Sequence, residues 1–175
     1  TTSTNDVARD PRYDAGAVVI AERQSRGRGQ RGNSWSSSAG ANLTFSVVLC
    51  PGFLEAAQQF YLSKAVSLAV CDTVESFDVR PQVKWPNDIY IDGRKVAGIL
   101  IENDLAGNFL SRSVVGIGIN VNQTECDPAL PNPTSLAVAA GRKLDRAEVF
   151  RLFYEKMSFR YGQLQQQRYA AMDTD

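Results

Sequence analysis

The sequence contains no histidine among its 175 residues, and this absence excludes several kinds of catalytic site. Ser-His-Asp and Cys-His arrangements need an imidazole, which is also the commonest metal ligand. The cysteines, Cys50, Cys71 and Cys126, are odd in number and lack Cys-x-x-Cys spacing, which argues against a disulfide framework or a zinc site. We therefore expect a reducing, cytoplasmic setting and chemistry carried by Lys, Arg, Asp, Glu and backbone amides.

The chain also lacks an excess of either charge and a long apolar run. Its 19 Lys and Arg residues equal its 19 Asp and Glu residues, so no overall field attracts it to nucleic acid or to an anionic membrane. No run of about 18 apolar residues occurs, and we expect no membrane span. The hydrophobic content of 43% suffices for one core, which predicts a single domain over residues 1–175. Because the first residue is Thr1 rather than Met, we expect a fragment of a longer protein.

Short runs of β-branched residues indicate the strands. They predict strands over 17–22, 42–50 and 111–123. The Asp92-Gly93 pair predicts a hairpin between a strand over 82–91 and a strand over 94–104, because this dipeptide suits a tight turn between apolar runs.

Apolar residues at three- and four-residue steps indicate the helices. They predict helices over 54–77, 133–141 and 144–169. Asp145 and Glu148 stand at capping-box spacing at the start of the last of these. The proline-rich segment 124–133 is typical of an irregular loop. Hairpin-linked strands with separate helices predict an α+β fold, built on a mixed, mostly antiparallel sheet with helices packed against it.

A loop rich in glycine and arginine follows the first predicted strand. Gly27, Gly29 and Gly32 satisfy the spacing of a dinucleotide-binding turn, but no helical periodicity follows them, as that turn requires. The arginines at 26, 28 and 31 stand among these glycines without an acidic residue, which suits a phosphate or an adenylate. Taken alone, the loop favours a solvated surface over a ligand site, and an RNA-binding module in which Trp35 stacks on a base is a further alternative.

Two further groups of polar and glycine residues interrupt apolar strands. The first holds Lys84, Asn87, Asp88, Lys95 and Gly98, which is more polarity than an apolar strand pair needs. In the second group, Gly116 and Gly118 stand within a strand, where glycine indicates close approach of a ligand or of another backbone, and Asn120 follows them.

Together these motifs resemble the catalytic domain of the biotin protein ligases. The glycine-rich adenylate loop of that family is similar to residues 27–35, its Lys-Trp-Pro-Asn-Asp motif with a downstream lysine is similar to 84–100, and its Gly-x-Gly-Ile-Asn motif is similar to 116–120. A Ser-Thr-Asn near the start of the family domain is similar to residues 3–5. The four motifs occur in the family order over about residues 1–123. Lipoate and octanoate protein ligases share the general fold, but their loop pattern differs and they lack Lys-Trp-Pro-Asn-Asp.

The resemblance implies a class II synthetase-like biotin ligase fold and a two-step reaction. Biotin and MgATP give biotinyl-5′-adenylate, and a lysine of a biotin carboxyl carrier protein domain then takes the biotin. It implies catalytic roles for Lys95, Arg28 and Arg31, with Lys95 between the biotin carboxylate and the α-phosphate. It implies substrate binding by Ser3, Thr4, Asn5, Gln24, Gly27, Gly29, Trp35, Lys84, Asn87, Asp88, Gly98, Gly116, Gly118 and Asn120. Asp88 is also the candidate Mg²⁺ ligand, and a homodimer is a possible assembly.

The sequence departs from the family pattern at several points. Gln30 and Asn33 stand where the family often has basic residues, so the loop carries less positive charge. The small C-terminal barrel of the family is not evident after the last predicted helix, and we expect a catalytic domain without it. No N-terminal DNA-binding domain is evident either. The alternatives that stay open are a lipoate or octanoate ligase and a nonenzymatic RNA-binding module that uses the Arg/Gly loop.

Overall fold

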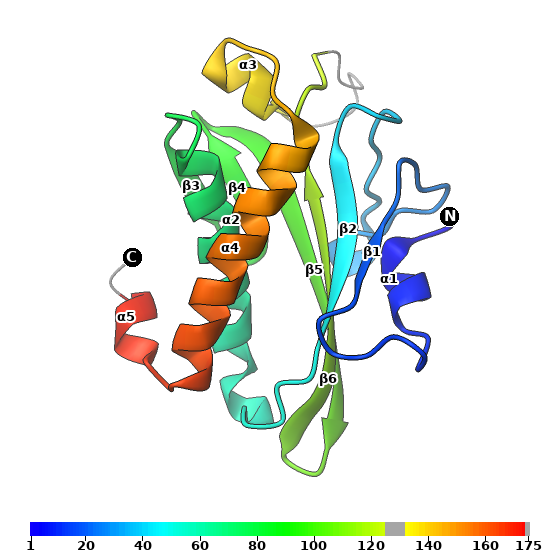
Figure 1. Cartoon of the computed structure of the whole chain (residues 1–175), viewed down its shortest axis with the longest axis vertical. Helices are drawn as coiled ribbons and strands as arrows, with labels where there is room; N and C mark the ends of the chain where they lie inside the picture. The colour runs from blue at the N-terminus through cyan, green and yellow to red at the C-terminus, as the bar shows by residue number, and fades with distance from the viewer. Residues whose placement is uncertain (125–131, 174–175) are drawn as a thin grey trace.

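The computed structural model describes residues 1–124 and 132–173, except for the side chain of Arg31. Six strands form one sheet in the order β1-β2-β6-β5-β4-β3 (Figure 1). Their bounds are Val18–Ile20 (β1), Leu43–Leu49 (β2), Pro81–Lys84 (β3), Asp88–Ile91 (β4), Arg94–Ala106 (β5) and Phe109–Ile119 (β6). Every pairing between these strands is antiparallel, so the predicted α+β class is confirmed.

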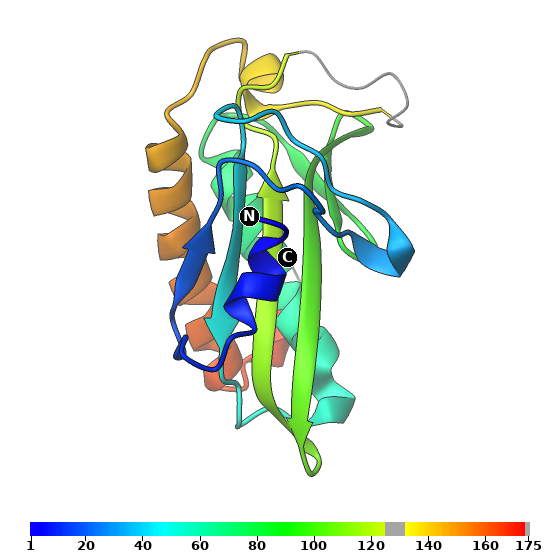
Figure 2. The same ribbon diagram turned by 90° about the vertical axis from the view of Figure 1, so that its right-hand side faces the viewer.

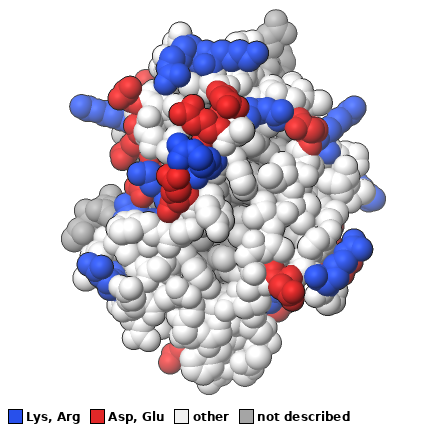
Figure 3. All heavy atoms as spheres, in the orientation of Figure 1, with Lys and Arg blue, Asp and Glu red and all other residues white. Residues whose placement is uncertain are grey.

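The main hydrophobic core lies between the sheet and two long helices, α2 (Gln59–Glu75) and α4 (Arg146–Gln165) (Figure 1). Phe45 of β2 lies at its centre and meets the rings of Phe150 and Phe153 edge-on, at centroid distances of 5.2 and 5.0 Å. Asp72 and Arg160 form an ion pair of 2.7 Å that joins α2 to α4. On this side of the molecule, Figure 3 shows Lys and Arg intermixed with Asp and Glu, as expected for a chain whose charges balance.

The opposite face of the sheet is covered by the N-terminal segment and by the loop that follows β1 (Figure 2). The short helix α1 (Thr4–Ala8) packs there through Ala8 on Val48 and Val114, which form a second, small apolar cluster. The loop contains a single 3-10 turn, η1 (Gln30–Gly32). Because strand residues alternate between faces, Val47 and Val115 serve the main core while their neighbours serve this cluster.

Most predicted elements are confirmed. Asp92 and Gly93 have φ values of +48° and +72°, as the predicted tight hairpin requires. The helix predicted over 54–77 is a 3-10 turn, η2 (Ala56–Gln58), followed by α2. The short predicted helix is α3 (Leu136–Ala140), and Asp145 caps α4 by accepting a hydrogen bond from the Ala147 amide at 2.9 Å.

Three expectations need correction or lie outside the structure. The strand predicted over 82–91 is two strands, β3 and β4, because the turn at 85–87 reverses the chain. The helix predicted over 144–169 ends at Gln165, and a separate helix α5 (Tyr169–Asp173) follows a turn in which Gln167 has a φ of +54°. Most of the predicted loop over 124–133 lies outside the described residues, as does Cys126. Within those residues, no helix has the length and apolarity needed to cross a membrane.

Candidate active site

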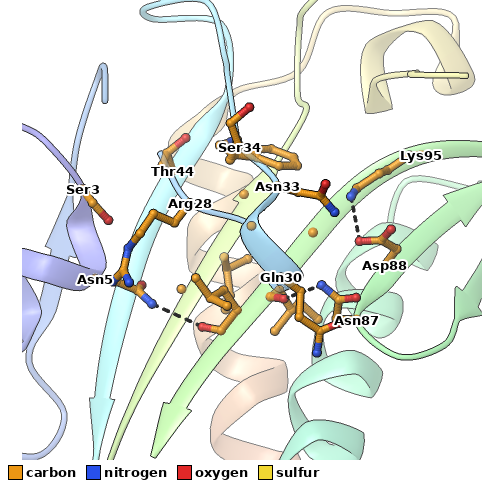
Figure 4. Close-up of a pocket in the computed structure, with 18 of the residues that line it drawn as sticks. Ser3, Asn5, Arg28, Gln30, Asn33, Ser34, Thr44, Asn87, Asp88 and Lys95 are labelled. Carbon is orange, nitrogen blue, oxygen red and sulfur yellow. Dashed lines mark hydrogen bonds and ion pairs between the residues drawn. The ribbon is translucent and has the colours of Figure 1, made fainter. Parts of the chain in front are cut away.

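A cavity of about 280 Å³ opens on the α1 face of the sheet (Figure 4). Its walls come from α1, the Arg/Gly loop, β5, β6 and the turn at 85–87. The structure brings together most of the predicted site residues, although they are distant in sequence. Those that line the cavity are Ser3, Thr4, Asn5, Gln24, Arg28, Gly29, Trp35, Lys84, Asn87, Asp88, Lys95, Gly98, Gly116 and Gly118.

One end of the cavity is lined by the uncharged polar side chains of Thr4, Asn5 and Gln24, with Ser46 buried behind them, and we call these four residues the neutral end. The Ser46 hydroxyl lies 2.8 Å from Thr4 Oγ1 and 2.6 Å from Asn5 Oδ1. Gln24 Oε1 accepts hydrogen bonds from the Thr4 amide at 2.6 Å and from the Thr4 hydroxyl at 3.1 Å. Thr4, Asn5 and Ser46 are buried. Because buried polar groups are costly without partners, this network fixes the side chains in place.

The strand glycines leave space for protein side chains. A Cβ atom at Gly116 would lie 2.2 Å from Asn5 Oδ1, and one at Gly118 would lie 2.2 Å from Trp35 Cε2. Gly98 faces Gly118 across β5 and β6, and a Cβ there would lie 3.1 Å from the Trp35 ring. The glycines therefore make a seat for the Trp35 indole and a recess for the Asn5 amide. The sequence pattern predicted close approach but not that these two side chains make it.

The other end of the cavity carries the charges of Lys84, Asp88 and Lys95, and we call these three residues the charged end. Lys95 Nζ lies 2.7 Å from Asp88 Oδ1 and 5.8 Å from the centroid of the Trp35 ring. Lys84 Nζ lies 3.2 Å from the Tyr90 hydroxyl and over the ring of the same residue. Lys95 is therefore neutralised by a carboxylate in this structure, whereas Lys84 is held by an uncharged aromatic side chain.

Arg28 points away from Lys95 towards α1 and β5, and lies beside Asn5 (Figure 4). Its guanidinium donates to the Glu102 carboxylate at 3.1 and 2.8 Å and lies 2.7 Å from Asp6 Oδ1. The loop sequence itself contains no acidic residue, so these partners come from other segments of the chain. Two carboxylates distant in sequence already balance its charge.

Asn87 and Gly27 have structural contacts of their own. Asn87 Nδ2 donates to the Ile99 carbonyl at 2.9 Å, and the Ile99 amide donates to the Asn87 carbonyl at 2.9 Å, so this residue fastens the 85–87 turn to β5. Gly27 lies outside the cavity lining, and its carbonyl accepts from the Trp35 amide at 2.9 Å. A Cβ at Gly27 would lie 2.2 Å from the Trp35 carbonyl oxygen, so the loop folds back on itself at this glycine.

Two other predicted residues are not among those that line the cavity. Asn120 is buried, and its Nδ2 donates to the Thr134 carbonyl at 3.0 Å, away from the cavity lining. The side chain of Arg31 lies outside the described part of the structure.

Several lining residues were not among the predicted site residues, although the sequence interpretation discussed two of them, Gln30 and Asn33, as loop positions. They are Gln30, Asn33, Ser34, Thr44, Trp85, Pro86, Ile99, Leu100 and Ile117. For Thr44, a polar residue in an otherwise apolar strand was an available signal. Trp85 lies within the recognised Lys-Trp-Pro-Asn-Asp motif, and at 68% exposure it is the most exposed large hydrophobic side chain among the described residues. The apolar strand residues carried no signal, because their type does not distinguish a cavity wall from the core.

The cavity does not form a protein-held metal site. Among the described residues, no three His, Cys, Asp or Glu side chains gather as metal ligands. Of the described residues that line the cavity, Asp88 is the one carboxylate, and it is paired with Lys95. Mg²⁺ keeps several waters and is commonly held by substrate phosphates with one or two carboxylates. Asp88 therefore fits a metal ion that arrives on ATP better than one held by the protein alone.

The sequence profile of the biotin/lipoate A/B protein ligase family matches residues 1–120. The chain belongs to this family. Among family relatives, the bifunctional ligase/repressor BirA of Bacillus subtilis is 38% identical over 150 residues, which are 81% of this chain and 45% of that protein. The biotin–[acetyl-CoA-carboxylase] ligase of Mycobacterium tuberculosis is 39% identical over 131 residues, 71% of this chain and 47% of that protein. The chain thus spans less than half the length of these two relatives.

The solved structures agree with this family assignment. The biotin protein ligase from Aquifex aeolicus, in complex with biotin and ATP, superposes with a TM-score of 0.82 and is 31% identical. The match covers 94% of this chain and 68% of that chain. The resemblance of the sequence motifs to the biotin protein ligases is therefore confirmed.

Proposed function

We propose that this protein is an ATP-dependent biotin ligase that forms biotinyl-5′-AMP and transfers biotin to a lysine of a biotin carboxyl carrier domain. The observation that carries the proposal is the single cavity with two unlike ends. A neutral, hydrogen-bonding end suits an uncharged polar ring, and a charged end suits reacting anions. The Aquifex relative bound to biotin and ATP supports the same pair of substrates here.

The neutral end is suited to the ureido ring of biotin. That ring carries two N–H donors and one carbonyl acceptor and needs a few polar partners in an otherwise apolar slot. Thr4 and Gln24 line the cavity and have side-chain atoms of both kinds, and Ser3 lies beside them. Asn5 acts by filling the recess at Gly116, since its amide already contacts Ser46 and Glu102. Biotin therefore enters with its ring towards α1.

The charged end is suited to adenylate formation. A biotin carboxylate oxygen attacks the α-phosphorus of ATP, the bond to the bridging oxygen breaks, and pyrophosphate leaves with the electron pair. Two anions must meet, so cations lower the barrier by stabilising charge on the phosphoryl oxygens. Lys95 is the group that we assign between carboxylate and α-phosphate, after exchanging Asp88 for the ligand. Arg28 and Arg31 assist from the loop, and Lys84 supplies a further cation.

The remaining roles concern ATP and the second step. Trp35 covers the bound adenylate from its glycine seat, with Gly29 and Asn87 framing the opening, and Asn120 serves the adenine side. Mg²⁺ arrives with the ATP phosphates, near Asp88. In the second step the carrier lysine, as a free amine, attacks the acyl carbon; AMP leaves with the electron pair of the broken C–O bond, and an amide forms. We place this reaction in the cytoplasm, with a homodimer as a candidate assembly.

ATP–pyrophosphate exchange with biotin, lipoate and octanoate offered in parallel tests the proposal. We expect biotin-dependent exchange and none with the two fatty acids. Exchange with lipoate or octanoate instead of biotin would assign the chain to the other branch of the family. No exchange with any acid would contradict a ligase function.

The RNA-binding alternative has a separate test. Arg28 is occupied by carboxylates and Trp35 is seated on glycines, so neither is presented for an RNA strand. A salt titration with a single-stranded RNA oligomer should therefore show weak binding with a shallow slope. A steep decrease of affinity with salt would support the RNA-binding module, because such a slope counts the phosphates contacted.

A further inference from the structure

Glu102 of β5 lies behind the cavity, and its side chain, 16% exposed, is not part of the cavity lining. Its carboxylate nevertheless contacts two residues that do line it. Oε2 accepts from Asn5 Nδ2 and from Arg28, both at 2.8 Å, and Oε1 accepts from Arg28 at 3.1 Å. Arg9 of the α1 C-cap lies 3.4 Å away. One carboxylate thus joins the Arg/Gly loop, α1 and β5.

Glu102 binds Arg28 through both carboxylate oxygens and takes two of the five N–H donors of the guanidinium. A guanidinium has five N–H donors in a fixed plane, and a carboxylate that takes two of them fixes the orientation of the whole plane. Two donors meet Glu102 and one meets Asp6. The other two have no partner among the described contacts, and Arg28 lines the cavity. Arg28 can therefore stay on Glu102 while it donates to an anionic ligand.

We propose that Glu102 is a positioning residue for adenylate formation: it fixes the Arg28 guanidinium in the cavity wall beside α1 and holds Asn5 in the recess at Gly116. The inference rests on the proposed ligase function. A glutamine at 102 has nearly the same shape but only one acceptor oxygen and no charge, so it cannot hold the guanidinium with two charge-assisted bonds. The orientation of Arg28 is then lost while the strand is unchanged.

The first measurement is adenylate formation by Glu102→Gln, Arg28→Ala and the double variant. We expect each single variant to reduce kcat about tenfold to a hundredfold, since misplacing a charge by about 1 Å has effects of that size. Because Glu102 acts through Arg28, adding Glu102→Gln to Arg28→Ala should change kcat by less than about twofold. Asp104→Asn is the matched control, with the same loss of charge at an exposed position two residues along β5. Additive losses in the double variant would overturn the proposal.

The second measurement does not depend on activity. Trypsin must take the arginine side chain out of its contacts before it cleaves, so freeing Arg28 from Glu102 should speed cleavage after residue 28 of the ligand-free protein. We expect about threefold to tenfold faster cleavage in Glu102→Gln and no change in Asp104→Asn. If Glu102→Gln melts below the assay temperature, both measurements are repeated with Arg28→Lys, which leaves Glu102 and Asn5 in place.

The two measurements, adenylate formation and trypsin cleavage, distinguish a failure of the proposed ligase function from a failure of the positioning role of Glu102. If the unmodified protein shows no biotin-dependent exchange, the proposed ligase function fails, and a cleavage rate that responds to Glu102→Gln still supports the hold on Arg28. If the unmodified protein is active and Glu102→Gln matches it in both kcat and cleavage, the positioning role of Glu102 is wrong.

Discussion

The two ends of the cavity are built in different ways. The neutral end is a buried network in which each side chain has a protein partner close in space, so it exists in full before a ligand binds. The charged end is partly exposed, and Lys95 is paired with Asp88, a protein carboxylate that a ligand must displace or share. Preformed hydrogen bonds favour recognition, whereas exchangeable ion pairs favour catalysis, because their partners change during the reaction. We therefore expect substitutions at the neutral end to act on biotin binding and those at the charged end to act on the rate.

The largest effect is expected for Lys95→Ala at the charged end. Loss of the cation between carboxylate and phosphate should reduce adenylate formation roughly a hundredfold to a thousandfold, with little change in melting temperature. Single-turnover formation of biotinyl-5′-AMP is the measurement, and Lys84→Ala is the comparison, since Lys84 has no carboxylate partner among the described contacts. If the activity of Lys95→Ala decreases only in proportion to its folded fraction, the role of Lys95 is structural and not catalytic.

Gly118→Ala should have the next largest effect, because its Cβ would overlap the Trp35 ring at 2.2 Å. The indole must leave its seat, and we expect a loss of about a hundredfold in kcat/KM for ATP, as for other displaced groups. Gly162→Ala is the control, since its Cβ meets nothing within 4 Å on α4. In a Trp35→Ala background, Gly118→Ala should lower kcat/KM for ATP only slightly further, because the indole ring is already absent. An equal loss in both backgrounds would show that the glycine serves something other than Trp35.

Gln30→Arg should strengthen the binding of biotinyl-5′-AMP. Gln30 lines the cavity, and a guanidinium there adds charge-assisted bonds to the phosphate that an amide cannot make. One such contact is worth roughly 1 to 3 kcal/mol, so biotinyl-5′-AMP should dissociate about tenfold to a hundredfold more slowly. Release is measured by chasing labelled adenylate, and biotinylation of bystander lysines should decrease in parallel. An unchanged release rate would mean that position 30 does not reach the phosphate.

Ser46→Ala should have the smallest effect, confined to the neutral end. Removal of the hydroxyl leaves the buried oxygen of Asn5 without its Ser46 donor, which costs about 1 to 3 kcal/mol. We expect a lower melting temperature and a KM for biotin raised about tenfold, with kcat nearly unchanged. Ser113→Ala removes an equally buried strand hydroxyl whose partner is Asn103, and it should lower the melting temperature without changing KM. A decrease in kcat for Ser46→Ala would contradict the expectation that the neutral end acts on biotin binding and the charged end on the rate.

The features that were predicted correctly depend on residues that are close together in the sequence. The Asp92-Gly93 hairpin and the Asp145 cap are set by the turn and capping chemistry of a few residues, and both are confirmed. Helix α1 was not predicted, because five residues are too few for an apolar period and it is held by contacts with distant strands.

The predicted site residues gather at one cavity, but their partners could not be predicted. Arg28 and Glu102 are 74 positions apart, and nothing in either segment indicates that they meet. Likewise, strand glycines indicate that something comes close but not which atom, so Trp35 at Gly118 and Asn5 at Gly116 emerged only from the three-dimensional arrangement.

The seat of Trp35 also gives the protein an optical reporter. The chain has two tryptophans, and they differ sharply in environment: Trp85 is 68% exposed, whereas Trp35 Nε1 is buried and has no hydrogen-bond partner in the described structure. An indole whose N–H lacks an acceptor changes its emission when an acceptor arrives, while an exposed indole is quenched by iodide. With iodide present to suppress Trp85, the remaining fluorescence follows events at the junction of the two substrates. Under the proposed ligase function, adenylate formation should therefore change the emission of the unlabelled protein.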